Sequence, residues 1–234
     1  MKRLSTIVIA IFAAMLLSTP AKGNPAGTLN VGNCPGGGMN ISNLVIDFTL
    51  PVGGGNGCTE TTSGTNISYT GGGPLVSAVS GTIKDLTTTS LLDFMTFDGN
   101  PNLHFDLTSV GPGSGNANCV GLILFQSCSP SGSNPLILTL TATGTSISLT
   151  ASGVARDLSA GSSTWTGVFT TQIVGQTPRQ IQLTLLGGGT ISSTYSGNFT
   201  VAAASQVPEP TTILLLGTGL AGIAAKVRKR RKAV

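Results

Sequence analysis

Apolar and polar residues alternate along the central part of the chain, between residues 24 and 206. Strict alternation is the pattern of a β-strand that buries one face and exposes the other. Each alternating stretch therefore predicts a half-buried strand. The apolar members of these stretches are Leu44, Ile46, Phe48 and Leu50; Leu103, Phe105 and Leu107; Ile147, Leu149 and Ala151; Trp165, Phe169 and Ile173; Ile181, Leu183 and Leu185; and Ile191, Tyr195, Phe199 and Val201.

Runs of turn-forming residues, rich in glycine, proline, asparagine and serine, separate these stretches. They lie at residues 53–55, 71–74, 98–101, 131–135 and 187–189. About ten short strands at this spacing predict an all-β domain, either an antiparallel β-sandwich or an irregular barrel. No stretch of the body has the period of a helix, so we expect no helix of any length there.

The first 23 residues contain the three parts of a secretory signal peptide. Two basic residues precede an uncharged apolar run, residues 4–17, and small residues follow it. Cleavage after Ala21 or after Gly23 would fit this pattern. An uncleaved anchor is the alternative, but a run of about 14 residues is shorter than the roughly 20 that span a bilayer. We therefore predict a signal peptide with a signal helix at residues 1–23, and the Sec machinery and signal peptidase as partners.

Export would place the four cysteines in an oxidising compartment, where they can form two disulfides. Three pairings are open to four cysteines. Pairing of Cys34 with Cys58 and of Cys119 with Cys128 closes the shortest loops and is the pairing that we favour. A redox role for Cys119 and Cys128 is the weaker interpretation, because their spacing is not C-x-x-C and no basic neighbour would lower a thiol pKa.

Residues 203–234 form a tail with three parts that follow a short linker. The sequence Pro208-Glu209-Pro210 comes first, then an apolar segment that predicts a transmembrane helix at about residues 211–227. A helix of that length spans about 25 Å, slightly less than the roughly 30 Å of a bilayer's hydrocarbon core. By the positive-inside rule, the bases at its end, within residues 226–232, remain cytoplasmic and the body lies across the membrane. These bases are Lys226, Arg228, Lys229, Arg230, Arg231 and Lys232.

This tail resembles the PEP-CTERM sorting tail of exopolysaccharide-making bacteria, which also carries the label ice-binding protein C-terminal domain. Pro208, Glu209 and Pro210 match the signature of the family residue by residue. The resemblance implies recognition by an exosortase, a membrane cysteine transpeptidase, and cleavage near this motif. The protein would then pass through a single-pass inner-membrane intermediate to the cell surface or the extracellular matrix. A plain membrane anchor is the alternative, and it explains the helix and the bases but not the motif.

The formal net charge of +4 comes from the ends of the chain. Nine of the twelve basic residues lie before residue 24 or after residue 225. The secreted domain that we predict at residues 24–202 contains three bases and seven acids, which gives a net charge of −4. Nucleic-acid binding needs a basic patch on a folded surface, so we exclude that class of partner.

The body offers few residues for catalysis. His104 is the only histidine, and it lies on the polar face of its predicted strand, where we expect a surface residue. No G-x-S-x-G motif occurs, and nothing in the sequence brings two of Asp93, Asp98 and Asp106 to the separation that glycoside hydrolysis requires. We therefore expect neither an enzyme nor a cofactor.

A weak calcium site is the one candidate for metal binding. Asp98, Asn100 and Asn102 occupy alternate positions, as do the first ligands of a calcium loop. Leu103 stands where an EF-hand has glycine and Ser109 where it has glutamate, so the loop is not an EF-hand. A tight turn explains the same residues without a metal, and we expect none to be bound.

The leading hypothesis is an exported, noncatalytic protein of the cell surface or extracellular matrix that an exosortase sorts through its tail. Its body would act by exposure, adhesion or association with extracellular polysaccharide. The alternative is a secreted glycan- or calcium-binding module, and a hydrolase is the third hypothesis.

Overall fold

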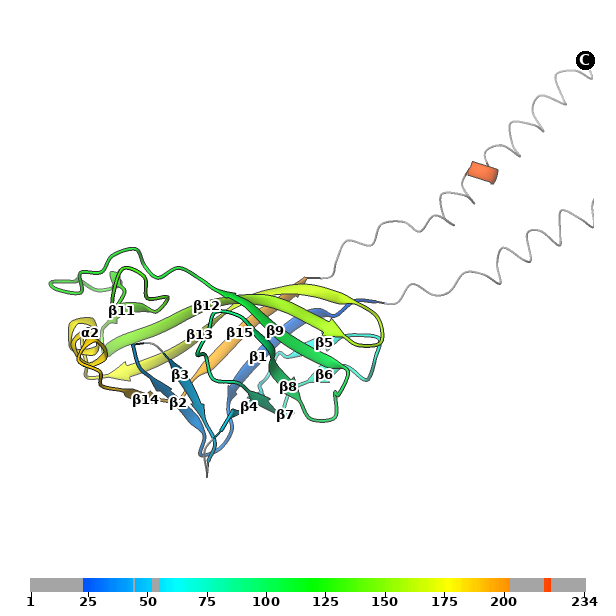
Figure 1. Ribbon diagram of the computed structural model, residues 1–234, viewed down its shortest axis with the longest axis horizontal. Coiled ribbons are helices and arrows are strands. Elements are labelled where there is room, and N and C mark those ends of the chain that lie inside the picture. The colour runs from blue at the N-terminus through cyan, green and yellow to red at the C-terminus, as the bar shows by residue number, and fades with distance from the viewer. Residues whose placement is uncertain (1–22, 44, 52–54, 203–216, 220–234) are drawn as a thin grey trace, which may run out of the picture. The chain divides into compact units, whose positions relative to one another are not determined.

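The computed structural model describes residues 23–43, 45–51, 55–202 and 217–219. Residues Lys22–Ala204 form one of two compact units of the chain, here called the body. The described part of the body contains fifteen strands and one helix (Figure 1). The expected sorting motif and basic end lie outside the described residues, as do the expected signal peptide, except for Gly23, and the expected transmembrane helix, except for residues 217–219.

Eight antiparallel strands close into a barrel, because β9 pairs with β12 and joins the two ends of the strand order. In that order the strands are β12 (Gly144–Asp157), β13 (Ser162–Val174), β15 (Ser196–Ala202), β1 (Ala26–Asn33), β4 (Gly57–Thr61), β7 (Ser80–Ile83), β8 (Leu91–Phe97) and β9 (Leu103–Val110). The prediction of an all-β antiparallel fold is confirmed, and the barrel is the form that it takes.

Seven further strands lie outside the barrel, which raises the total above the ten or so expected. Most have two to four residues, too few for alternation to be recognised. They are β5 (Asn66–Ser68) and β6 (Leu75–Val76) beside β1; β10 (Ser127–Cys128) and β11 (Ile137–Thr141) beside β12; and β14 (Ile191–Ser193), β2 (Gly38–Ile41) and β3 (Ile46–Thr49) in a separate three-stranded sheet.

Strand β12 is the strand at which the barrel closes. Its first half pairs with β11 and its second half pairs with β9, while β13 lies along its whole other edge. The β9 register shifts between Ser152 and Gly153. A Cβ at Gly153 would overlap the carbonyl oxygen of Asp106 and the indole of Trp165, so glycine is what allows β9 to close the barrel here.

An aromatic cluster fills the core. Phe169 lies with its ring centroid between 4.9 and 6.1 Å from four other rings. One of these, Phe48, belongs to β3, so the cluster joins the small sheet to the barrel wall. Trp165 is 1% exposed, as its alternation predicted, and its Nε1 donates a hydrogen bond to the Asp106 carbonyl oxygen at 3.0 Å.

The helix α2 (Pro178–Leu186) overturns two expectations. We expected no helix in the body and a strand through Ile181, Leu183 and Leu185, and both predictions are wrong. Thr177 and Gln180 form a capping box and Pro178 stands in the first turn, which are helix-start signals. Ile181 and Leu185 are buried one helical turn apart, whereas Leu183 is exposed. Residues 187–189, which we predicted to be turn-forming, follow this helix, and Gly187 is its C-cap.

Candidate functional site

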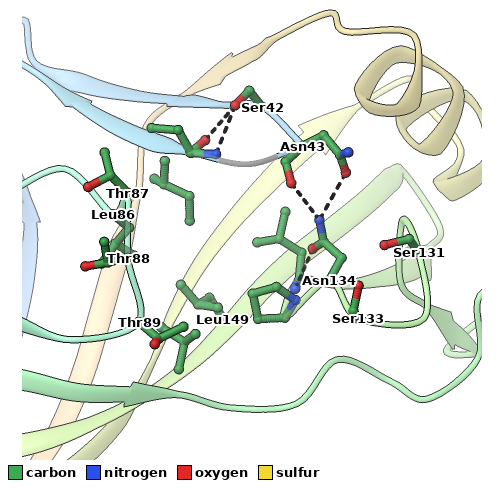
Figure 2. A pocket seen from close by; sticks show the side chains of 15 residues that line it. Ser42, Asn43, Leu86, Thr87, Thr88, Thr89, Ser131, Ser133, Asn134 and Leu149 are labelled. Atoms are coloured by element: carbon green, nitrogen blue, oxygen red, sulfur yellow. Dashed lines mark hydrogen bonds between the residues drawn. The ribbon is translucent and has the colours of Figure 1, made fainter.

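A cavity of about 300 Å³ opens on the surface of the body where three segments meet. Figure 2 shows Thr87, Thr88 and Thr89 along one side and Ser131, Ser133 and Asn134 along the other, with Leu149 between them. The third segment, residues 42–46, leads into β3. The cavity is lined by Ser42, Asn43, Val45, Ile46, Leu86, Thr87, Thr88, Thr89, Val110, Ser131, Ser133, Asn134, Pro135, Leu136 and Leu149.

Asn134 joins two of these segments. It is 5% exposed, and its Nδ2 donates to the backbone oxygen of Asn43 at 3.1 Å and to its Oδ1 at 3.3 Å (Figure 2). Its Oδ1 accepts from the amide of Leu136 at 2.9 Å. A buried amide with its groups satisfied in this way fixes the loop geometry, because breaking it would leave polar groups without partners. Asn134 therefore holds the segment at Asn43 against residues 134–136 at one side of the cavity.

The threonine side is held by an isolated β-bridge between Ile46 and Leu86. The Ile46 amide donates to the Leu86 oxygen at 3.2 Å and the Leu86 amide donates back at 2.8 Å. The chain then leaves the bridge, and Thr87, Thr88 and Thr89 are exposed at the rim. The bridge thus presents three hydroxyls in a row from a segment that belongs to no strand.

The rim of the cavity is polar and uncharged, whereas its floor is apolar. The hydroxyls of four rim residues make no hydrogen bond to another described residue: Thr87, Thr89, Ser131 and Ser133. Leu136 and Leu149 in the floor are each 3% exposed. None of the fifteen described residues that line the cavity is ionisable. Such a site suits a neutral ligand with both hydroxyl groups and a C–H face.

A second cluster lies on the outer face of β8, β9 and β12, where Arg156 contacts two carboxylates. Its Nη2 lies 2.7 Å from Asp93 Oδ1 and 2.9 Å from Asp106 Oδ1, and its Nε donates to Asp106 Oδ2. The Asp93 amide also donates to Asp106 Oδ1 at 2.8 Å, with Asp93 at a φ of +51°. These contacts join β8, β9 and β12.

His104 belongs to the same cluster and is not the simple surface residue that we expected. Its side chain is 21% exposed, and its Nδ1 lies 2.8 Å from Asp93 Oδ1. Its Nε2 lies 3.0 Å from the backbone oxygen of Pro101. Both ring nitrogens thus face an acceptor, so neither points toward space where a substrate could lose a proton to it.

Burial and ion pairing act in opposite directions on Asp106. Burial alone would raise the pKa of this carboxyl, but the hydrogen bonds and charge of Arg156, with the Asp93 amide, hold its pKa below the ordinary value. The hydrogen bond and the charge of Asp106 in turn raise the pKa of Arg156. Charge-assisted hydrogen bonds between Arg156 and Asp106 therefore join β9 to β12.

The weak calcium candidates lie in the turn between β8 and β9. Asn100 Oδ1 accepts from the Tyr69 hydroxyl at 2.7 Å, and Asn102 Nδ2 donates to the Gly71 oxygen at 2.7 Å. Asp98 is exposed. Within the part of the chain that the structure describes, no group of three His, Cys, Asp or Glu side chains could hold a metal ion. The two asparagines here fix the neighbouring loop.

Both disulfides have the expected pairing. Cys34 is bonded to Cys58 and Cys119 to Cys128, with Cα–Cα distances of 5.7 and 5.3 Å. Cys119 and Cys128 are 2% and 0% exposed, and their bond closes a short loop beside β11.

Pro208, Glu209, Pro210 and the bases from Lys226 to Lys232 lie outside the described residues. Among the described residues, no helix has the length and hydrophobicity needed to cross a membrane. Comparison with family models nevertheless gives a match at residues 206–231, to the PEP-CTERM protein-sorting motif. The chain carries a PEP-CTERM sorting motif.

This match confirms the resemblance based on Pro208, Glu209 and Pro210. The PEP-CTERM motif implies export, a membrane-anchored intermediate and processing by an exosortase. It covers the tail and leaves the body without an assigned role. No curated protein and no solved structure matches the chain.

Proposed function

We propose that this chain is an exported, noncatalytic protein of the cell surface or extracellular matrix whose barrel binds a neutral polysaccharide in the cavity of Figure 2. The PEP-CTERM tail supports delivery to the outside of the cell. The observation that carries the binding proposal is the uncharged hydroxyl and amide rim above an apolar floor.

Sugar rings match both parts of this cavity. Their hydroxyls exchange hydrogen bonds with serine, threonine and asparagine side chains, which both donate and accept. Their C–H faces pack against aliphatic floor residues such as Leu136 and Leu149. At about 300 Å³ the cavity is at the small end of ligand sites, which suits a short stretch of a longer polymer.

The charge of the lining favours neutral over acidic sugars. A uronate bound here would lose water around its carboxylate, and no cation among the described lining residues would compensate. A neutral sugar has no such cost. The site should therefore discriminate by charge before it discriminates by ring stereochemistry.

Titration calorimetry with neutral glucan and galactan oligosaccharides, against uronic-acid oligosaccharides, tests this proposal. We expect a Thr87→Val, Thr89→Val variant to bind the neutral sugars about tenfold more weakly, since each lost hydrogen bond contributes about 0.5–1.5 kcal/mol. Thr164→Val is the matched control, because Thr164 is an exposed threonine on β13 that does not line the cavity. Absence of heat with every neutral sugar, or equal loss in the control, would overturn the binding proposal.

A further inference from the structure

The loop between Cys119 and Cys128 exposes a cluster of large apolar side chains. Val120, Ile123, Leu124 and Phe125 are 59%, 67%, 52% and 79% exposed. We call these four residues the apolar tip. Soluble surfaces seldom gather so many exposed large apolar residues in six positions, so the tip is a candidate contact surface.

The tip is held in place from beneath. The disulfide closes the loop, and Leu122 packs against the core. Gln182 of α2 is 3% exposed, and its Nε2 donates to the backbone oxygens of Ala117 and Pro130 at 2.8 and 3.1 Å. The helix therefore braces both sides of the loop. It adds two half-exposed leucines, Leu183 and Leu186, to the same end of the body, where Figure 1 shows α2 near β11.

The backbone amides of three tip residues, Val120, Ile123 and Phe125, have partners within the protein. The Phe125 amide donates to the Leu140 oxygen at 2.8 Å and the Gln126 amide to the Ile123 oxygen at 3.0 Å. Two side-chain oxygens accept from the Ile123 and Val120 amides, at 3.2 and 3.0 Å. Satisfied amides lower the cost of moving a loop out of water into an apolar medium. They also leave fewer donors for strand pairing with another protein.

The segments around this loop contain a single charged side chain. Residues 107–155 contain no charged side chain, and Arg179 is the only one in residues 158–202. Arg179 donates to Gln182 Oε1 at 2.7 Å. A lipid headgroup layer would therefore meet no carboxylate from these segments, and one cation, which favours approach to a phosphate-bearing surface.

We infer that the apolar tip inserts into the surface of a lipid bilayer. A second copy of the chain fits less well, because a stable protein interface uses about 20–30 residues from each partner and the tip offers four. Insertion of apolar side chains into lipid needs no complementary surface, so a small convex tip suffices. This inference is independent of the sugar-binding proposal, since no tip residue lines the cavity.

The test uses the body alone, residues 22–204, because the apolar terminal segments would bind vesicles by themselves. The body contains both disulfides and the complete barrel. We expect it to cosediment with phosphatidylcholine vesicles. Its affinity for vesicles that also contain phosphatidylglycerol should differ by no more than about threefold, since the tip has no charge. Phe125→Gln should weaken vesicle binding at least about tenfold.

Leu92→Gln is the matched control, because Leu92 is 72% exposed on β8, outside the tip, and its loss should leave binding unchanged. In a Phe125→Trp variant, bromine-labelled lipids should quench the new indole, while the buried Trp165 is spared. Failure of the body to bind either vesicle, or equal binding by Phe125→Gln, would overturn the inference. Dimerisation that Phe125→Gln abolishes, without vesicle binding, would assign the tip to a second copy instead.

Discussion

The two ends of the long β12–β13 hairpin are held together by different interactions. At the end where Arg156 pairs with Ser162, ion pairs join β8, β9 and β12. At the other end, where Gly144 pairs with Val174, the neighbouring segments carry no ion pair in the described structure and rely on a disulfide and on Gln182. We call these the charged end and the uncharged end.

The chain enters and leaves the body near the charged end. Gly27 pairs with Val201, and Ala202 pairs with Thr164 near the charged end, so both described ends of the body lie there. The apolar tip lies at the uncharged end. Ala202, the last described residue of the body, thus lies at the end opposite to the surface that we assign to lipid contact. Acid should loosen one end and reducing agents the other.

The largest effect should come from the uncharged end. Replacing Cys119 and Cys128 with alanine should lower the free energy of unfolding by about 2.7 kcal/mol, by the loop-entropy relation for a loop of about ten residues. Urea denaturation measures this change. The loss should persist at every pH at which the native protein folds, because the disulfide does not titrate. A loss found only in acid would contradict the contrast between the two ends.

At the charged end, Arg156→Met should cost about 2 kcal/mol of unfolding free energy, because it removes charge-assisted hydrogen bonds to Asp106, a carboxylate that is 5% exposed. Arg179→Met is the matched control at the uncharged end. Arg179 contacts a neutral glutamine, so its loss should stay within about 0.5 kcal/mol. Equal losses in the two variants, measured by urea denaturation, would show that the Arg156 network stabilises the fold no more than the Arg179 contact does.

Acid should act through Asp106. The folded protein holds the pKa of Asp106 below the ordinary value, so its ionised form stabilises the fold above the unfolded pKa of about 3.9. That contribution is lost as the pH falls through the lower, folded pKa. In Asp106→Asn, stability should therefore depend less on pH below about 4 than in the native protein. Urea midpoints across that range give the comparison, and parallel profiles would exclude Asp106 as the acid-sensitive group.

The last effect is expected in the core, away from both ends, and only at alkaline pH. Burial raises the pKa of Tyr195 to about 12, above its ordinary value of 10.0. The neutral phenol, which donates to the Cys58 oxygen at 3.1 Å, is thus favoured in the folded state, and stability should fall as the pH rises from about 10 toward 12. Ultraviolet titration of a Tyr69→Phe variant observes Tyr195 alone. Ionisation at the ordinary pKa would show that the ring is accessible.

Long strands and linear motifs could be predicted from the sequence because their signals are local. The alternation of Leu103, Phe105 and Leu107 identified β9, and all three side chains are buried. The tail was recognised from Pro208-Glu209-Pro210, the apolar segment that follows it and the terminal bases, and the match at residues 206–231 confirms the sorting motif. Such features depend little on contacts between segments that are distant in sequence.

The errors and omissions arose where local signals compete or where distant segments meet. Ile181, Leu183 and Leu185 alternate like a strand, yet the first and last also lie one helical turn apart, and the capping box from Thr177 to Gln180 decides for the helix. The cavity joins segments near residues 43, 88 and 134, of which only the last was predicted as a turn, and no local signal links the three. Their meeting depends on barrel closure, which no local pattern contains.

The central claim is that the tail delivers the barrel to the outside of the cell and is then removed. Changing Pro208, Glu209 and Pro210 together should trap an unprocessed form in the inner membrane. The most direct measurement is the intact mass of the mature protein from native cells. We expect a mass that lacks the signal peptide and the residues after the Pro208–Pro210 motif, with both disulfides oxidised. A mature protein that still contains Val234 would contradict the account.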